Sequence, residues 1–318
     1  MKRTALICGV TGQTGAYLAH YLLKKGYKVV GSSRDSDACD TSRLSALSIL
    51  DKISLVSLSP VDFRSVLQVI STHRPDYIYY LAGQTSVGLS FNQPFEAFES
   101  IATSTLNFLE VLRLLDFPCR FFNAGSTECF GDSLGIVLDE NSQMKPVSPY
   151  AVAKATSFWM TENYRRSYGL YACTGLLSNH ESPLRPARFV TSKIVSSIHA
   201  IKNKEQEYLT LGNVHVSRDW GWAPDYVDAI YKMASADVPD DYIIATGKTY
   251  SLMDLIESLS HLAGLNAGEI LRTDNSLLRP SDISTAKLSS QKIQGILGWR
   301  PKVGFSALAE KLYNHSLF

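Results

Sequence analysis

The feature that most constrains the fold of this chain is a run of three glycines near its start. Gly9, Gly12 and Gly15 follow the apolar segment 6–10 and precede the segment 16–25, whose apolar residues recur at helical spacing. Glycine permits a tight turn and lets a phosphate approach the free N–H groups of a helix N-terminus. Outside this strand and helix context the spacing would indicate only a turn. Within it, the run predicts a dinucleotide site formed by Gly9, Thr11, Gly12, Gln13, Thr14 and Gly15.

Patterns typical of strands and helices alternate through the first half of the chain. We predict strands at 6–10, 29–31, 53–58, 77–82, 120–124 and 172–177, and helices at 16–25, 63–72, 101–115 and 151–168. Such alternation predicts an α/β fold with a Rossmann-type, doubly wound parallel sheet. Beyond Asn179 the pattern loosens. We therefore expect a dinucleotide-binding domain over 1–178 plus parts of 214–250, and a smaller, mainly C-terminal α/β substrate-binding domain over 179–318.

Composition excludes several classes of protein. Hydrophobic residues make up 45% of the chain and charged residues 19%, with a net charge of +1, which argues against disorder and against a nucleic-acid partner. The five cysteines are odd in number and form no C-x-x-C pair, so we expect neither a disulfide framework nor a metal site. Glycines break the first apolar segment too early for a signal peptide or a membrane span, which predicts a cytoplasmic protein without a membrane partner.

The end of the second predicted strand indicates which dinucleotide fits. NAD sites usually place a carboxylate there for the ribose 2′-hydroxyl, whereas NADP sites place an arginine for the 2′-phosphate. Here the strand ends in Gly31-Ser32-Ser33-Arg34, and Arg43 follows in the next loop. Arginine pairs well with phosphate, so the sequence predicts NADP bound by Arg34 and Arg43. Asp35 is the residue that leaves NAD, or a merely solvated charged loop, as the alternative.

A hydroxyl, a carboxylate, a phenol and an amine are arranged as an acid–base site requires. Ser126 and Glu128 follow the predicted strand 120–124, at the edge of a parallel sheet where ligands bind. Tyr150 and Lys154 are four residues apart at the start of a predicted helix and hence share one face. Because a nearby ammonium group stabilises tyrosinate, we expect the pKa of Tyr150 to fall toward neutrality. This spacing alone is common in structural helices, and its combination with the glycine run carries the prediction.

Taken together, these residues resemble the extended short-chain dehydrogenase/reductases, and over nearly its full length the chain resembles the GDP-mannose 4,6-dehydratases. The resemblance rests on the segments 9–15, 84–91 and 148–154, and on the runs Asn179-His180-Glu181-Ser182-Pro183, Arg218-Asp219-Trp220-Gly221 and Arg279-Pro280. The runs from Asn179 and from Arg218 are the specific ones. The resemblance implies a hydro-lyase of nucleotide sugar metabolism that uses NADP to convert GDP-mannose to GDP-4-keto-6-deoxymannose, a step of deoxysugar biosynthesis.

The chemistry of that family assigns a role to each predicted catalytic residue. The sugar is oxidised at C4, water is lost across C5 and C6, and the hydride returns to C6. The resemblance implies that Tyr150 takes the C4 hydroxyl proton, Lys154 holds the tyrosinate and the ribose, and Ser126 binds the C4 oxygen. It also implies that Glu128 removes the C5 proton and protonates the departing C6 hydroxyl. This second acid–base task separates a dehydratase from a simple oxidoreductase, and an exposed structural glutamate is the alternative interpretation.

The resemblance extends to binding residues outside this set. It implies further cofactor contacts at Leu81, Ala82, Gln84, His180 and Arg185. It implies substrate contacts at Ser86, Asn179, Val190, Lys193, Gly212, Arg218, Arg279 and Asp282, with Asn179 and Lys193 on the diphosphate, both arginines on the nucleotide and Asp282 facing the guanine edge. For the diphosphate and nucleotide contacts (Asn179, Lys193, Arg218, Arg279 and Asp282), a surface or interdomain salt bridge is the alternative. His180 and Glu181 lack further ligands at metal-binding spacing.

The chain departs from the family pattern at a few positions. Ser126 stands where threonine is usual, which keeps a hydroxyl for the same role. Thr14 stands where aspartate is common and Ser59-Pro60 where Asp-Leu is common, so we expect an altered cofactor affinity. The chain is also shortened between Ala263 and Leu278, where sugar-nucleotide selectivity would partly be decided.

Several functions remain open at this point. The dehydration could act on another GDP-sugar such as a GDP-heptose, or the Tyr150 and Lys154 pair could serve a GDP-4-keto-sugar reductase or epimerase. A non-enzymatic alternative is an NADP-sensing regulatory protein. The loop 34–43 corresponds to a family segment that reaches a neighbouring subunit, which predicts a homotetramer or homodimer.

Overall fold

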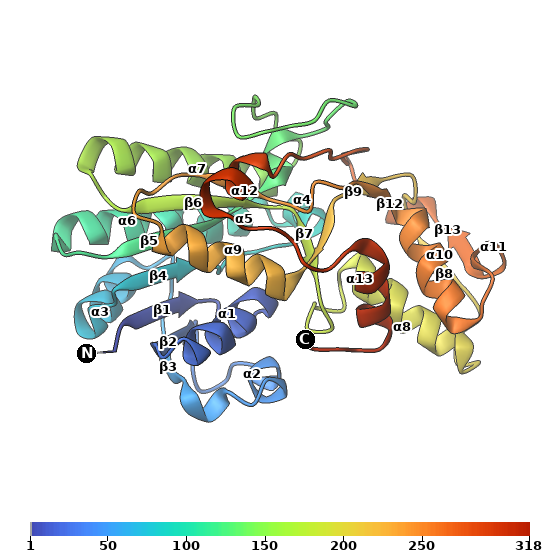
Figure 1. Cartoon of the computed structure of the whole chain (residues 1–318), viewed down its shortest axis with the longest axis horizontal. Coiled ribbons are helices and arrows are strands. Elements are labelled where there is room, and N and C mark those ends of the chain that lie inside the picture. The colour runs from blue at the N-terminus through green and yellow to red at the C-terminus, as the bar shows by residue number, and fades with distance from the viewer. Residues whose placement is uncertain (1) are drawn as a thin grey trace.

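The computed structural model describes residues 2–318, and a seven-stranded parallel sheet is the centre of this part of the chain (Figure 1). The strands lie in the order β11-β6-β5-β4-β1-β2-β3. Their bounds are β1 Thr4–Cys8, β2 Lys28–Ser33, β3 Ser54–Ser57, β4 Tyr77–Tyr80, β5 Arg120–Ser126, β6 Ala172–Leu177 and β11 Tyr242–Ile244. The order reverses beside β1, which makes the sheet doubly wound and confirms the predicted α/β, Rossmann-type fold.

Both faces of the sheet are covered because its strands are apolar on both sides. In β1, Ala5 and Ile7 belong to one buried core and Leu6 and Cys8 to another. The first core is completed by α1 (Gln13–Lys24) and α9 (Ala223–Ser235), and the second by α3 (Phe63–His73) and α6 (Ser104–Leu115). Helix α7 (Pro149–Tyr168) packs beside α6 against β5 and β6. Continuous apolar strands are thus explained by burial on two faces.

Helix boundaries follow local capping chemistry. Helix α1 begins three residues earlier than the predicted Ala16, directly after the glycine turn. The Ser148 hydroxyl caps α7 by accepting the N–H of Ala151 at 3.1 Å, and Pro149 occupies the first turn. Gly169 ends α7 in the left-handed conformation, at φ +67°. These caps place Tyr150 and Lys154 within the first two turns of α7.

A second, smaller unit has its own buried core. That core joins α8, β8, β10, α10, α11 and α13. The elements outside the large sheet are β7 Asn179–Glu181, α8 Val190–Lys202, β8 Leu209–Leu211, β9 Ser217–Arg218, β10 Trp220–Trp222, β12 Tyr250–Ser251, α10 Leu252–Ala263, α11 Ala267–Ile270, β13 Leu271–Thr273, α12 Gln291–Leu297 and α13 Phe305–Tyr313. In the shortened segment 263–278, α11 and β13 remain, and β13 pairs with β8.

The C-terminal part of the chain contributes to both cores. Residues of α9, β11 and α12 pack with α1 in the sheet's first core. Helices α8, α10 and α13 lie together beyond one end of the sheet (Figure 1). The division of the chain at residue 178 stays a prediction.

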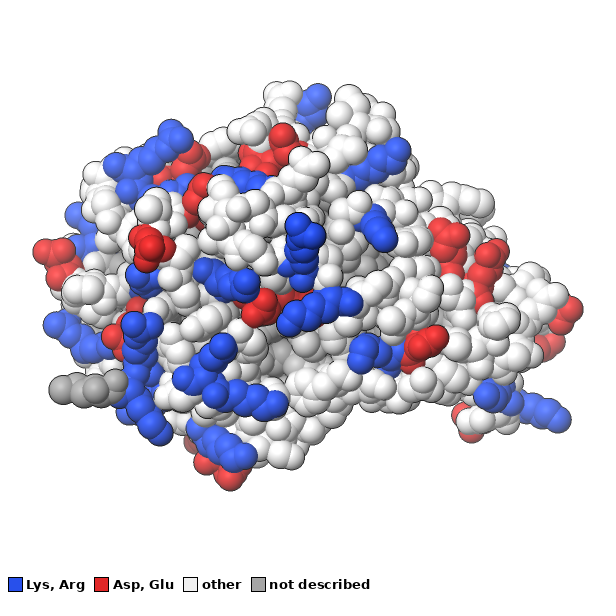
Figure 2. Space-filling view, viewed as in Figure 1, with Lys and Arg blue, Asp and Glu red and all other residues white. Residues whose placement is uncertain are grey.

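Short helices complete the chain. They are α2 Ser42–Ala46, η1 Leu50–Lys52, α4 Val87–Asn92, α5 Pro94–Phe98, the π-helical segment η2 Glu99–Thr103, η3 Thr127–Phe130 and η4 Asn275–Leu277. Across residues 2–318, no helix combines the length and apolar character needed to cross a bilayer. On the face shown in Figure 2, basic and acidic side chains are interspersed over the surface.

Candidate functional site

One cavity of about 570 Å³ runs along the carboxyl ends of the parallel strands and continues to the smaller unit. Residues at or just beyond the ends of six strands line it: Gly9, Ser33, Leu58, Leu81, Ser126 and Leu177. The opposite wall comes from the segment between β7 and α8, from the ends of β8 and β9, and from the segment 277–282. Open α/β sheets bind ligands at this edge, so the cavity is the candidate site.

The glycine turn shapes one end of the cavity. Gly9 has φ +84°, which favours glycine, and the Gly12 N–H donates to the Gly9 carbonyl at 3.1 Å. A Cβ on Gly15 would lie 2.1 Å from the Gly9 oxygen, so only glycine fits. The first turn of α1 carries neither a capping side chain nor an acidic residue. Its N–H groups are therefore suited to an anion such as a pyrophosphate.

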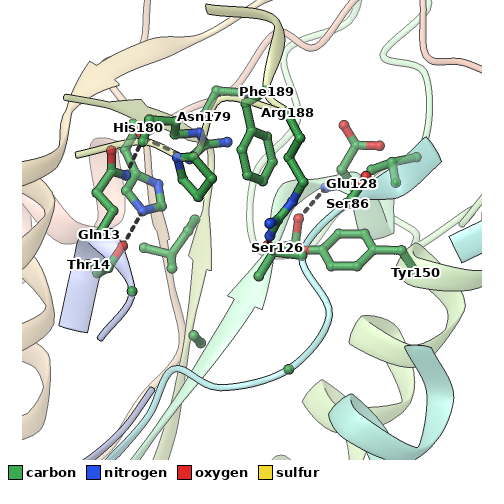
Figure 3. Close-up of a pocket in the computed structure, with 18 of the residues that line it drawn as sticks. Gln13, Thr14, Ser86, Ser126, Glu128, Tyr150, Asn179, His180, Arg188 and Phe189 are labelled. Atoms are coloured by element: carbon green, nitrogen blue, oxygen red, sulfur yellow. Dashed lines mark hydrogen bonds between the residues drawn. The ribbon is translucent and has the colours of Figure 1, made fainter. Parts of the chain in front are cut away.

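His180 lies in strand β7 and contacts Thr14 beside the glycine turn (Figure 3). Its Nδ1 lies 2.9 Å from the Ser178 carbonyl, which can only accept, so Nδ1 carries the proton. Nε2 then accepts from the Thr14 hydroxyl at 2.8 Å. Burial, assisted by Arg185, lowers the pKa of His180 to about 4, and the ring is neutral at physiological pH. Thr14, where aspartate is common in the resembled family, thus joins an uncharged pair.

Of the charged residues that follow β2, Arg34 lies at the cavity, whereas Asp35 and Arg43 do not. Arg34 lines the cavity beside Ser33. The Asp35 carboxylate accepts the N–H groups of Asp37 and Ala38 at 2.9 and 3.1 Å and so closes a local turn. Arg43 does not line the cavity. Its guanidinium donates to the carbonyls of Leu184 and Thr11, at 2.8 and 3.3 Å, and lies 3.4 Å from Asp40.

The predicted acid–base residues all line the cavity. Figure 3 shows Ser126, Glu128 and Tyr150 on one wall of it. Ser126 ends β5, and its hydroxyl accepts the Glu128 N–H at 3.3 Å. Tyr150 and Lys154 project from α7, with the Lys154 Nζ 5.8 Å from the centre of the tyrosine ring. The Lys154 ammonium donates to the Ala124 carbonyl at 2.6 Å, and burial lowers its pKa to about 8. The structure therefore brings the four side chains together on the elements that the sequence predicts.

The direction of the Tyr150 pKa differs from the prediction. Burial raises the pKa of the phenol above its usual value, and the neighbouring Ser126 hydroxyl offsets this only in part. Lys154 does not lower it because its ammonium is directed to the Ala124 carbonyl rather than to the phenol oxygen. The expectation of a pKa near neutrality was therefore wrong for the protein alone, since desolvation outweighs charge.

Glu128 lies in a network of charges that reaches the smaller unit. Its carboxylate is 3.8 Å from the Arg218 guanidinium, which donates to Asp282 at 2.9 Å. Arg279 lies 3.5 Å from the same Asp282 oxygen. Burial raises the pKa of Glu128, whereas Arg218 opposes that rise. A carboxyl whose pKa is balanced in this way suits both the acceptance and the return of a proton.

The structure places most of the predicted binding residues at this cavity and three away from its lining. Arg43, Gln84 and Lys193 do not line it. Gln84 instead bonds its amide group to the backbone of Ser86, at 2.7 and 2.9 Å. The residues that do line it are Gly9, Thr11, Gly12, Gln13, Thr14, Gly15, Arg34, Leu81, Ala82, Ser86, Ser126, Glu128, Tyr150, Lys154, Asn179, His180, Arg185, Val190, Gly212, Arg218, Arg279 and Asp282.

Sequence reasoning missed further residues of the lining. Thr85, Arg188 and Phe189 come from two loops that face one another across the cavity. Leu58 and Pro60 line the end near Arg34, where the resembled family carries Asp-Leu at positions 59 and 60. The sequence signal at Arg188 is weak because the residue lies between Pro186 and α8, outside any periodic pattern. Within residues 2–318, no cluster of three or more acidic, histidine or cysteine side chains suits a metal ion.

Comparisons with known proteins agree with this arrangement. The chain is 38% identical to GDP-mannose 4,6 dehydratase 1 of Arabidopsis thaliana over 328 residues, which covers 99% of this chain and 90% of the relative. Its fold matches that of a UDP-glucose 4-epimerase from Thermus thermophilus in complex with NAD, at a TM-score of 0.86, 22% identity and 98% coverage of both chains.

A second structure, RMD from Pseudomonas aeruginosa complexed with NADPH, matches at a TM-score of 0.79 and 21% identity, covering 99% of this chain and 97% of the other. Both structural matches describe the fold alone. The family model for GDP-mannose 4,6 dehydratase matches residues 6–312, nearly the whole chain. The chain therefore belongs to the GDP-mannose 4,6 dehydratase family.

Proposed function

We propose that this enzyme dehydrates GDP-mannose to GDP-4-keto-6-deoxymannose with the help of a nicotinamide dinucleotide. The observation that carries the proposal is the position of Glu128 in the same cavity as Ser126, Tyr150 and Lys154. Hydride exchange at C4 needs only the hydroxyl, the phenol and the amine. A half-buried carboxylate beside them supplies the second acid–base group that the loss of water requires, and relatives at 33–38% identity are named for this reaction.

The lining fits a dinucleotide at the glycine turn. An uncapped helix start without acidic side chains favours a pyrophosphate, and the two structures with the same fold bind NAD and NADPH. NADP is the form that we propose for this chain. Arg34 lines the cavity, whereas Asp35 does not, and one oxygen of its carboxylate accepts two backbone N–H groups.

The chain's own residues then perform the proton transfers around C4. A bound nicotinamide would supply the hydride acceptor for C4 and the hydride donor for C6. Tyr150 accepts the proton of the C4 hydroxyl, and Ser126 holds the same oxygen by a hydrogen bond. Burial raises the pKa of this phenol, so it needs nearby positive charge to ionise. Lys154, in the next turn of α7, supplies that charge once its ammonium turns from the Ala124 carbonyl toward the phenol.

Glu128 acts once C4 is a ketone. The adjacent carbonyl makes the C5 proton acidic, and the Glu128 carboxylate accepts it. The same carboxyl then donates a proton to the C6 oxygen as it leaves as water. Hydride addition at C6 requires one proton at C5, and the proton that Tyr150 took from the C4 hydroxyl balances it. Burial raises the pKa of Glu128, which favours the protonated form needed for the second step, and Arg218 preserves the carboxylate needed for the first.

The substrate lies along the rest of the cavity. With the sugar at Ser126 and Tyr150, the nucleotide extends to the end lined by Gly212 and Arg279. Asn179 and Val190 also line the cavity, and we propose that Asn179 faces the diphosphate. Asp282, proposed to accept from the guanine edge, is held by both Arg218 and Arg279.

The test is the conversion of GDP-mannose by the purified protein without added reductant. Mass spectrometry should detect a product lighter by one water, with no net consumption of NADPH. Glu128→Gln should slow this loss by about a hundredfold to ten thousandfold, the range for a general acid or base. Net use of NADPH would favour a GDP-4-keto-sugar reductase, and an unreacted GDP-mannose alongside a dehydrated GDP-heptose would correct the sugar.

We propose that the enzyme is a homo-oligomer, a dimer or a tetramer. Helices α5 and α7 expose large apolar side chains, with Phe95 84% and Trp159 55% accessible. Beside them an apolar groove is lined by Pro94, Phe98, Val147 and Val152. Such a surface is unusual on a monomer. Light scattering of the wild type and of Trp159→Lys tests this, because a lysine at the contact should shift the mass toward the monomer.

A further inference from the structure

Arg188 lies in the cavity at a point that the predicted site does not include. It precedes α8, and Figure 3 shows its side chain directed from the segment of Phe189 toward the wall that carries Ser126 and Tyr150. Its Nη2 donates to the Thr85 hydroxyl at 3.3 Å, in the loop after β4. The guanidinium also lies 5.1 Å from the centre of the Phe189 ring. The side chain therefore contacts residues of both walls, and it is exposed to solvent.

The charge of Arg188 is not compensated by any acidic side chain. Three other arginines of the lining have carboxylate partners: Arg185 with Glu181 at 3.3 Å, Arg218 with Asp282 at 2.9 Å and Arg279 with Asp282 at 3.5 Å. Across residues 2–318, no carboxylate lies within 4.0 Å of Arg188. A guanidinium in a cavity with a hydroxyl and an aromatic face as its neighbours is ready to pair with an anion.

The lysine expected to bind the substrate diphosphate does not reach this place. Lys193 lies in the first turn of α8 but is not part of the cavity lining, whereas Val190 and Thr191 of the same turn are. Between the acid–base residues and the nucleotide end, Arg188 is therefore the cation that has no carboxylate partner. In a nucleotide sugar, the phosphate attached to the sugar occupies this stretch.

We propose that Arg188 binds the phosphate that is attached to the sugar and that it, rather than Lys193, determines the preference for a nucleoside diphosphate. This inference rests on the proposed function, since it assumes a nucleotide sugar in the cavity. Arg188 would exchange its bond to Thr85 for a forked contact with the phosphate oxygens. Because Thr85 and Arg188 belong to opposite walls, this exchange couples phosphate binding to the contact between the walls.

The test compares the dissociation constants of GDP and GMP by calorimetry, with the enzyme saturated with NADP. The ratio of the two constants isolates the second phosphate and does not depend on the base. A charge-assisted contact of this kind is worth about a tenfold to a hundredfold preference for GDP. Arg188→Gln should reduce that preference to near unity. Lys193→Gln, the matched control in the neighbouring turn, should leave it unchanged.

Either a wild type without preference for GDP or an Arg188→Gln variant that keeps the preference would overturn the proposal. So would a loss of the preference in Lys193→Gln alone. The same ratio measured with UDP and UMP separates this result from the proposed function, because tighter binding of uridine nucleotides would contradict GDP-mannose as substrate and still report on Arg188. Should the glutamine variant fail to fold, Arg188→Lys must lower the preference in part, since it keeps the charge and loses the fork.

Discussion

Replacement of Arg218 by glutamine should move the acid limb of the pH profile of kcat/KM to higher pH. The proposed base, Glu128, must be a carboxylate to accept the C5 proton, so activity falls as the pH drops through its pKa. Burial raises that pKa and Arg218 lowers it. Without Arg218 the carboxylate loses a favourable partner, and its pKa in the free enzyme rises further. The pH profile of kcat/KM reports this value for the free enzyme.

The magnitude follows from the distance between the two groups. The charges lie 3.8 Å apart, which at an effective dielectric constant of about 20 corresponds to about 4 kcal/mol. This equals about three pKa units, since one unit is about 1.4 kcal/mol. Asp282 lies 2.9 Å from Arg218 and compensates part of its charge. We therefore expect the acid limb to shift upward by about one to two units, an estimate from the same electrostatic argument.

The matched control is Arg279→Gln. Arg279 lines the same cavity and pairs with Asp282, but its influence on the pKa of Glu128 is smaller than that of Arg218. Both variants should lower kcat/KM through lost substrate contacts, and only Arg218→Gln should displace the limb by a full unit or more. An unmoved limb in Arg218→Gln, at any level of activity, would refute the assignment of Glu128 as the titrating base.

Three further predictions test the site and its support. Gly15→Ala would place a Cβ 2.1 Å from the Gly9 oxygen, so it should abolish cofactor binding and lower the free energy of unfolding in urea by about 1–3 kcal/mol. The control Gly295→Ala places its Cβ in open space in α12 and should be neutral or stabilise by up to about 1 kcal/mol. In fluorescence titrations, Arg34→Ala should weaken the binding of NADP at least about tenfold and change the binding of NAD little. An equal loss of affinity for both cofactors would contradict the 2′-phosphate contact. Asp219→Ala removes the acceptor of three backbone N–H groups, on Thr246, Gly247 and Lys248. Thermal unfolding should therefore show that the free energy of unfolding falls by about 2–4 kcal/mol, and an unchanged melting temperature would exclude this structural role.

The sequence predicts the sheet and the centre of the site well because both follow from local patterns. Apolar strands, a glycine turn and a capped helix identify the strand ends, and a parallel sheet brings those ends to one edge. Ser126, Glu128, Tyr150 and Lys154 meet there although 28 residues separate the first from the last, since β5 and α7 pack together. The order of strands, the glycine turn and the helix start thus sufficed to predict that these residues lie at one edge, whereas their catalytic roles stay predictions.

The rest depends on packing between segments far apart in the chain. Arg43 turns away from the cavity to bond the carbonyls of Leu184 and Thr11, and no local pattern predicts those partners. Arg188 enters the cavity because its loop faces the loop of Thr85, a contact across 103 residues. The pKa of Tyr150 rises because burial, which the sequence does not quantify, outweighs the charge of Lys154.

The central claim is that one active site removes a hydride from C4, eliminates water and returns the same hydride to C6. The most direct test is the reaction of GDP-mannose deuterated at C4, in unlabelled water and with unlabelled cofactor in the medium. The account predicts a product lighter by one water that carries the deuterium at C6. Deuterium found in the free cofactor pool, or a product without deuterium at C6, would contradict it.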